Sequence, residues 1–165
     1  MESGTLVAIV RSIQSGALSE DEVDEAVARF ESAVPHPAPS DLIFWPGNWG
    51  LPQDATPEAV VATARGWTPR VVALRVVRST PTRRGSARCL VELEGGQFKS
   101  VSVVSESKVK AGAVVAVALS GVELRDGRRA EHGYVDKAYS MGILLDEVGA
   151  EVGSDLTKQY AKIRN

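Results

Sequence analysis

The first third of the chain carries apolar residues at the spacing of an α-helix. An opening series follows the i, i+3, i+4, i+7 pattern, which places its members on one helical face and predicts a helix that ends near Gly16. The members of this series are Leu6, Ile9, Val10 and Ile13. An amphipathic helix of this kind needs a second element against which to bury its apolar face.

A second helix is marked at its start by Ser19 and Glu22. A serine followed three residues later by a glutamate is typical of a capping box, in which each side chain bonds the backbone amide of the other residue. The apolar stripe then continues through Val23, Ala26, Val27, Phe30 and Val34. Prolines at positions 35, 37 and 39 end the helix, because proline lacks an amide donor and biases the preceding residue away from helical geometry.

Two further helices are predicted before residue 68. A short one spans Asp41 to Trp45, with Ser40 as its N-cap. The last begins at Thr56 and Pro57, since proline is favoured at the first helical position. We expect the core to include Leu42, Ile43, Val60, Val61, Ala64 and Trp67. Four helices, one of them very short, are therefore expected in residues 1–67.

From Pro69 onward the apolar period changes from helical to two, which is typical of strands. Strand-like runs cover residues 72–77, 87–93, 99–104 and 114–119, and glycine-containing turns separate them. This spacing predicts a small barrel of about five strands. The spacing of Leu156, Tyr160 and Ile163 predicts a terminal helix. We place the boundary between the two domains, residues 1–67 and 68–165, at Trp67 to Pro69.

Composition limits the class of protein. The chain has 165 residues, of which 44% are hydrophobic, enough for one large or two small cores. It has no run of about 18 apolar residues and no basic start followed by an apolar block, so we expect a cytoplasmic protein. A single cysteine, Cys89, excludes an internal disulfide and is expected to be a small buried strand residue.

Charge divides the chain at the same boundary. Residues 1–67 hold three basic and ten acidic residues, a net charge of −7, whereas residues 68–165 hold sixteen basic and eleven acidic residues, a net charge of +5. Two domains with different partners are implied. Six arginines in the basic part follow one another without an intervening acidic residue, and they fit either phosphate binding or a solvated strand face. They are Arg70, Arg75, Arg78, Arg83, Arg84 and Arg88.

No enzyme motif is present. The sequence has no P-loop, no Gly-x-Ser-x-Gly elbow, no His-Glu-x-x-His helix and no dinucleotide fingerprint. His36 lies between two prolines and is expected to cap or pack, and His132 has no second histidine or cysteine beside it for metal binding. We predict no catalytic activity, no cofactor and no metal site.

Residues 6–67 resemble the small helical immunity proteins that neutralise nuclease colicins and pyocins. The motif Ser40-Asp41-Leu42-Ile43-Phe44-Trp45-Pro46, the preceding His36-Pro37 and the later Thr56-Pro57-Glu58 carry this resemblance. It implies a shared anchor for the toxin around Ser40, Asp41, Phe44, Trp45 and Pro46. It also implies variable selectivity positions on the second helix at Glu20, Val23, Asp24, Val27 and Glu31. From the residues alone, the helix-two charges also fit a solvated face, and Trp45 and Trp49 also fit packing.

Residues 103–153 resemble a second family, the oligonucleotide-binding (OB) barrel that forms the tRNA-binding domain of bacterial phenylalanyl-tRNA synthetase and occurs in free-standing tRNA-binding proteins. The shared pattern is carried by Lys110-Ala111-Gly112, Gly121, Asp126-Gly127, Met141 and Asp146-Glu147-Val148-Gly149. The resemblance implies a nucleic-acid-binding function for this barrel, and the six arginines together with Lys108 are the basic residues predicted to contact the nucleic acid. Dimerisation or docking is the alternative for this barrel.

The fold expected is therefore a two-domain α plus β chain, with a small four-helix immunity-type bundle followed by an OB-like β-barrel. The function expected is that of a bacteriocin immunity protein, which binds and inhibits the cytotoxic nuclease domain of a cognate bacteriocin or polymorphic toxin. The alternative is a tRNA- or nucleic-acid-binding protein whose helical half is an adaptor for protein interaction.

Overall fold

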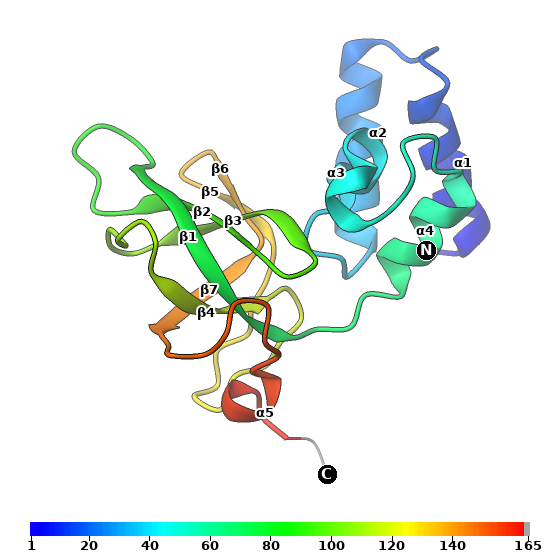
Figure 1. Cartoon of the computed structure of the whole chain (residues 1–165). Helices are drawn as coiled ribbons and strands as arrows, with labels where there is room; N and C mark the ends of the chain where they lie inside the picture. Colours follow the sequence, from blue (N-terminus) through cyan, green and yellow to red (C-terminus); the bar gives the residue numbers. More distant parts are fainter. Residues whose placement is uncertain (164–165) are drawn as a thin grey trace. The chain divides into compact units, whose positions relative to one another are not determined.

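The helical part of the chain begins with two long helices and continues with shorter ones (Figure 1). In this computed structural model, which describes residues 1–163, the chain divides into two compact units, Met1–Trp67 and Thr68–Asn165. The first unit contains α1 (Ser3–Gln14), α2 (Glu20–Ala33), α3 (Pro39–Phe44), the 3-10 turn η1 (Pro46–Trp49) and α4 (Pro57–Arg65). The four predicted α-helices of this unit are confirmed.

Local sequence signals set most of the helix ends. The amide of Ser19 donates to Glu22 Oε2 at 2.8 Å and the amide of Glu22 donates to Ser19 Oγ at 3.3 Å, which confirms the capping box of α2. Thr56 Oγ1 accepts from the amide of Ala59 at 3.2 Å and caps α4. The prediction that Ser40 caps α3 is wrong, because α3 begins at Pro39, two residues before the predicted start at Asp41, and Ser40 therefore lies inside the helix.

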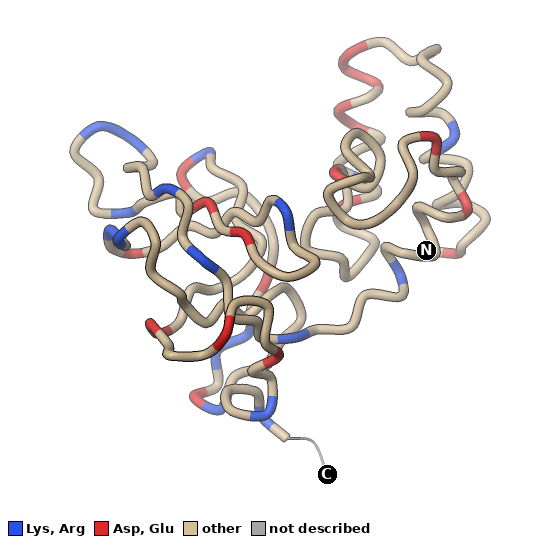
Figure 2. Tube along the Cα trace, viewed as in Figure 1, with Lys and Arg blue, Asp and Glu red and all other residues tan. Residues whose placement is uncertain are grey.

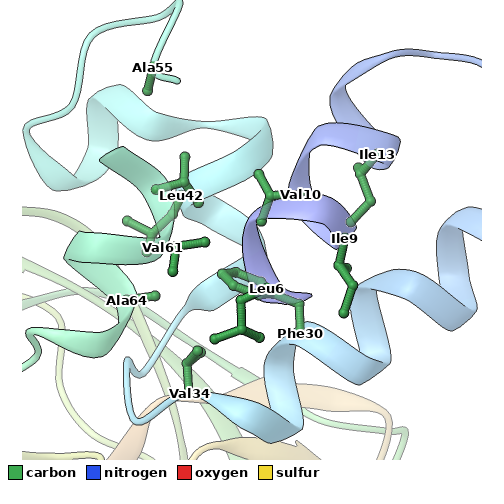
Figure 3. Packing of buried hydrophobic residues seen from close by; sticks show 11 residues of the cluster. Leu6, Ile9, Val10, Ile13, Phe30, Val34, Leu42, Ala55, Val61 and Ala64 are labelled. Atoms are coloured by element: carbon green, nitrogen blue, oxygen red, sulfur yellow. The ribbon is translucent and has the colours of Figure 1, made fainter. Parts of the chain in front are cut away.

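The core of the first unit collects the predicted apolar faces. Leu6 and Val10 of α1, Phe30 of α2, Leu42 of α3 and Val60 of α4 are all completely buried. Figure 3 shows this cluster, in which side chains from different helices point toward one another. Ile43 and Trp49 pack against the cluster from partly exposed positions. Burial of these apolar faces is what stabilises helices that are too short to persist alone.

The second unit contains a five-stranded antiparallel sheet and a separate hairpin. The sheet strands are β1 (Val71–Pro81), β2 (Cys89–Gly95), β3 (Phe98–Ser105), β4 (Val114–Leu119) and β7 (Gly142–Glu147), in the order β3-β2-β1-β4-β7. The hairpin consists of β5 (Gly133–Val135) and β6 (Ala138–Ser140). The predicted strand runs are confirmed. Gly142 allows β7 to lie close to β4, since an added Cβ would collide with the carbonyl of Ala118.

The predicted closed barrel is not shown. No ladder joins the edge strands β3 and β7 within residues 1–163, although the amide of Met141 donates to the carbonyl of Ser102 at 2.8 Å just ahead of β7. A core of small and branched residues lies along the sheet and the segments that follow it. Its buried members are Val71, Ala73, Ala116, Ala118, Val122, Leu124, Ala130 and Leu156.

The predicted terminal helix is shorter than the sequence spacing implied. α5 (Thr157–Tyr160) is a single turn, and Ile163 lies outside it with 70% of its surface exposed. The chain leaves the helix because Ala161 forms a β-bridge with Leu124 and the amide of Lys162 donates to the carbonyl of Glu123 at 2.8 Å. Backbone pairing therefore replaces a further helical turn. None of the described helices is long and apolar enough to cross a membrane.

Two phenylalanines of the helical unit provide a matched test of this core. Phe30→Ala should lower the free energy of unfolding by about 3–5 kcal/mol, because Phe30 is completely buried and its truncation leaves a cavity. Phe44→Ala, the same truncation at a side chain that is 40% exposed, should cost about 1 kcal/mol or less. Urea denaturation followed by helical circular dichroism measures both. Equal losses would contradict the assignment of Phe30 to the core and Phe44 to the surface.

Candidate functional site

The residues of the Ser40-to-Pro46 motif lie on one short turn of the helical unit. Pro39 begins α3, the amide of Trp45 donates to the carbonyl of Asp41 at 2.8 Å to end it, and Pro46 begins η1. Leu42 is completely buried and attaches the middle of α3 to the helical core, and Ile43 packs against the same core from a partly exposed position. This attachment leaves other side chains of the turn at or near the surface.

Phe44 and Trp45 form an exposed aromatic pair at the end of α3. Their exposed fractions are 40% and 61%, and their ring centroids lie 5.9 Å apart in an edge-to-face arrangement. Aromatic side chains bury large areas with few rotatable bonds, and two exposed together are typical of a protein-binding surface. Ser40 is half-buried and Pro46 is buried, so these two residues shape the turn more than they present side chains.

Asp41 lies half-buried on the same turn. Its Oδ2 accepts a hydrogen bond from Trp49 Nε1 at 3.3 Å. Burial raises the pKa of the Asp41 carboxyl above its ordinary value of 3.8, and the hydrogen bond from Trp49 opposes part of that rise. A carboxylate that is desolvated in this way gains more from a cationic or hydrogen-bonding partner than a fully hydrated one does.

Trp49 belongs to a cluster of three aromatic rings, which we call the His-Trp-Trp cluster. It consists of the buried His36 and the half-buried Trp49 and Trp67. The His36 ring lies 4.5 Å from the Trp49 ring and 5.0 Å from the Trp67 ring, and the two indoles lie 6.0 Å apart, all edge to face. His36 is 1% exposed, and its Nδ1 accepts from the amide of Ala38 at 3.0 Å. The expectation that His36 packs is confirmed. Sequence reasoning missed the cluster, because no local pattern links positions 36, 49 and 67.

The predicted selectivity positions lie on α2, which contacts α3. Glu20 and Asp24 are exposed, whereas Val23, Val27 and Glu31 are half-buried. Val23 and Val27 pack against the helical core, so both have a structural role. α2 carries six acidic residues and one arginine, and Figure 2 shows the acidic positions along this helix. The selectivity role of these positions stays a prediction.

Strand pairing brings several of the six arginines close to acidic residues that are distant in the sequence. Arg78 binds Glu92 at 2.5 Å, and Arg88 lies 3.3 Å from Glu106 and 3.6 Å from Asp136. Of the other positions, Arg75 is paired in register with Glu94, and Arg70 lies 5.9 Å from the Phe98 ring centroid in a cation–π contact. Arg83, Arg84 and Lys108 are exposed, and within residues 1–163 none of the three is in an ion pair.

The β1–β2 loop, residues 82–88, is joined to the β5–β6 hairpin. Asp136, in the hairpin turn, accepts from Thr82 Oγ1 at 3.3 Å and pairs with Arg88 at 3.6 Å. Tyr134 on β5 is 70% exposed, and its ring lies 5.2 Å from that of Tyr139 on β6. The carboxylate of Asp136 therefore joins the loop that carries the exposed Arg83 and Arg84 to the hairpin that carries the tyrosine pair.

Two further candidate side chains, His132 and Cys89, lie in the second unit. His132 Nδ1 lies 2.8 Å from Ser120 Oγ. In the part of the chain that the structure describes, no three His, Cys, Asp or Glu side chains are grouped to hold a metal ion. Cys89 is buried, as its position in an apolar strand predicted.

The half-buried carboxyl of Asp41 should make stability depend on pH. Because its pKa is raised in the folded state, the unfolded chain ionises this group first as the pH rises, and the folded state loses stability through that range. Asp41→Asn, which keeps the shape without the charge, should therefore be more stable than wild type at pH 7 and equal to it well below pH 3.8. Urea denaturation at both pH values measures the difference.

Asp54→Asn is the matched control for this prediction, since Asp54 is an exposed acidic residue of the same unit. It should stay close to wild type at both pH values. A stability difference between Asp41→Asn and wild type that does not change with pH would contradict the assigned burial of the Asp41 carboxyl.

Comparison with known proteins assigns the helical unit. Residues 4–70 match the family described as colicin immunity protein / pyocin immunity protein, and the match ends as the strand-rich unit begins. The chain is also similar to the uncharacterized protein YezA of Bacillus subtilis (strain 168), with 39% identity over 59 residues that cover 36% of this chain and 79% of YezA. Through its helical unit, the chain belongs to the colicin and pyocin immunity protein family.

Proposed function

We propose that this protein is an immunity protein whose helical unit binds and inhibits the cytotoxic nuclease domain of a cognate bacteriocin or polymorphic toxin. The observation that carries the proposal is the exposed pair Phe44 and Trp45 beside the half-buried Asp41, within a region that matches the immunity family. Aromatic side chains are among the residue types that supply most of the energy at protein interfaces, and a desolvated carboxylate gains more from a cationic partner than a hydrated one does.

Charge supports the same partner class. The helical unit has three basic and ten acidic residues, and six of the acidic residues lie on α2. A nuclease is basic around its substrate groove, so an acidic partner is steered toward that groove and, once bound, repels the phosphate backbone of nucleic acid. The exposed Glu20 and Asp24 contribute negative charge on α2 that attracts the basic groove. The Phe44–Trp45 pair provides the apolar contact that becomes buried in the complex.

The chemistry of the aromatic pair indicates the shape of the partner. Phe44 and Trp45 occupy positions where the immunity-protein resemblance implies tyrosine hydroxyls in many members. Neither side chain has a hydroxyl, so the cognate toxin is expected to offer an apolar pocket there in place of hydrogen-bond acceptors. Trp45 is the larger and more exposed of the two, and its truncation should therefore have the greater effect on binding.

Within this proposal, residues 1–67 are the toxin-binding domain and residues 68–165 are an OB-like barrel fused to it, in a protein that acts in the cytoplasm of the toxin producer. The barrel could bind the same toxin, recruit its nucleic-acid substrate, or connect immunity to tRNA. The antiparallel order β3-β2-β1-β4-β7 is compatible with such a barrel.

The test measures inhibition of a purified nuclease. The toxin candidate is the C-terminal domain of the protein encoded beside this gene, produced together with the full-length chain. Wild type should inhibit it at one-to-one stoichiometry, and Trp45→Ala should weaken the complex by about 2–4 kcal/mol, about 30- to 1,000-fold in Kd. Calorimetry and a nuclease assay give the affinity and the inhibition.

Tyr134→Ala is the matched control, because Tyr134 is an aromatic residue of similar exposure in the other unit. It should leave nuclease inhibition unchanged. Full inhibition by Trp45→Ala, or an equal loss in both variants, would contradict the assignment of the contact to the Phe44–Trp45 pair.

A nucleic-acid-binding function is the second candidate, and the joined loop and hairpin favour it. Single-stranded nucleic acid is bound by basic side chains together with aromatic rings on which bases stack. Arg83 and Arg84 supply charge without an ion-pair partner in residues 1–163, and the 70% exposed Tyr134 supplies a ring face on the adjoining hairpin. The ion-paired Arg78 and Arg88 fit this role less well.

Salt dependence of tRNA binding tests the second candidate. The affinity should fall steeply as salt rises, and Arg83→Glu with Arg84→Glu should abolish binding or reduce the slope of log K against log salt by roughly 1 to 2. Lys99→Glu with Lys158→Glu changes the net charge equally at exposed positions elsewhere, and it should weaken binding less. Absence of tRNA binding by wild type at low salt would rule this function out.

A further inference from the structure

We propose that Trp49 is a positioning residue for the toxin-binding site, which holds the carboxylate of Asp41 in place for its partner through a single hydrogen bond. This inference rests on the proposed function, because it assigns a role within the same site. Trp49 lies on η1, three residues after the end of the Ser40-to-Pro46 motif, and its role follows from its contacts.

The indole of Trp49 is fixed on two sides. Its Nε1–H donates to Asp41 Oδ2 at 3.3 Å, and its ring lies 4.5 Å from His36 and 6.0 Å from Trp67. The donor is therefore held by ring packing and does not depend on the mobility of a long side chain. A donor fixed in this way orients its acceptor at little entropic cost when a partner binds.

The hydrogen bond leaves part of the Asp41 carboxylate available. Trp49 is the one hydrogen-bond partner of this carboxylate within residues 1–163, so Oδ1 can accept from an incoming partner. The same turn exposes Phe44 and Trp45. A carboxylate fixed beside two exposed rings forms a prearranged acceptor for a cationic or amide donor.

The hydrogen bond also acts on the charge of Asp41. Burial favours the neutral carboxyl and raises its pKa, whereas the bond from Trp49 favours the carboxylate and lowers it. No charged side chain of α1, α2, α4 or η1 is among the causes of the shift. The His36 ring lies 4.5 Å from the Trp49 ring, and its NMR signals can be followed separately from those of the aspartates.

A purely structural role for Trp49 is the competing explanation, since its ring also packs against the helical core. Trp49→Phe separates the two roles, because it keeps an aromatic ring and removes the donor. Trp67→Phe is the matched control. It removes an indole from the same His-Trp-Trp cluster without removing the hydrogen bond to Asp41.

The first measurement is a pH titration of the free full-length protein by NMR, in which the carbon-13 signals of the aspartate carboxyls are monitored. In Trp49→Phe the pKa of Asp41 should rise above the wild-type value, and in Trp67→Phe it should stay at the wild-type value. In wild type, the indole N–H signal of Trp49 should shift as Asp41 titrates, which tests the bond even if Trp49→Phe does not fold. The proposal would be overturned if the pKa of Asp41 were unchanged in folded Trp49→Phe. It would also be overturned if the indole N–H signal of Trp49 did not shift as Asp41 titrates.

The second measurement uses the purified nuclease domain from the inhibition assay. Trp49→Phe should weaken the complex severalfold, because the Asp41 carboxylate is then no longer held in the orientation that the partner binds and must be ordered on binding. In the Asp41→Asn background the same change should have little further effect, because the carboxylate through which it acts is gone. Equal losses in both backgrounds would overturn the positioning role. If the nuclease does not bind wild type, the proposed function fails, while the titration still decides whether Trp49 holds Asp41.

Discussion

The burial of Leu42 is the contact on which the candidate site depends. A helix of six residues is not stable in water on its own, so α3 exists because Leu42 inserts completely into the helical core. Pro39 and Pro46 add to this by fixing backbone angles at the first positions of α3 and η1. With the turn attached from inside, Phe44 and Trp45 can remain exposed without loosening the fold.

Asp41 is placed for binding at the expense of the stability of the helical unit. An ionised carboxyl that is half-buried and has one hydrogen bond costs folding free energy at neutral pH. Groups of this kind are common at binding sites, where activity is retained at the expense of stability. The His-Trp-Trp cluster limits that cost, because it presents the Trp49 donor at a fixed place.

In the second unit, pairing between strands places acidic residues opposite arginines and so reduces the local positive charge. A series of six arginines without an acidic residue between them is a basic segment in the sequence, but antiparallel pairing places Glu92 opposite Arg78 and Glu94 opposite Arg75. Arg88 reaches Glu106 and Asp136. Of the six arginines, Arg83 and Arg84 are exposed and in no ion pair within residues 1–163, and Asp136 joins their loop between β1 and β2 to the tyrosine-bearing hairpin.

The sequence by itself determined the helices, most of the strands, the capping box of α2 and the family of the helical unit, because these depend on residues a few positions apart. Local signals failed where a neighbouring residue or a distant backbone competed, as with Pro39 at the start of α3 and the bridge that ends α5. Only the tertiary structure decided that Phe44 and Trp45 stay exposed, that Trp49 bonds Asp41 and that two of the arginines are paired with acids. These contacts join residues that are separated by a turn, a strand or more, and no periodic pattern encodes which of them meet.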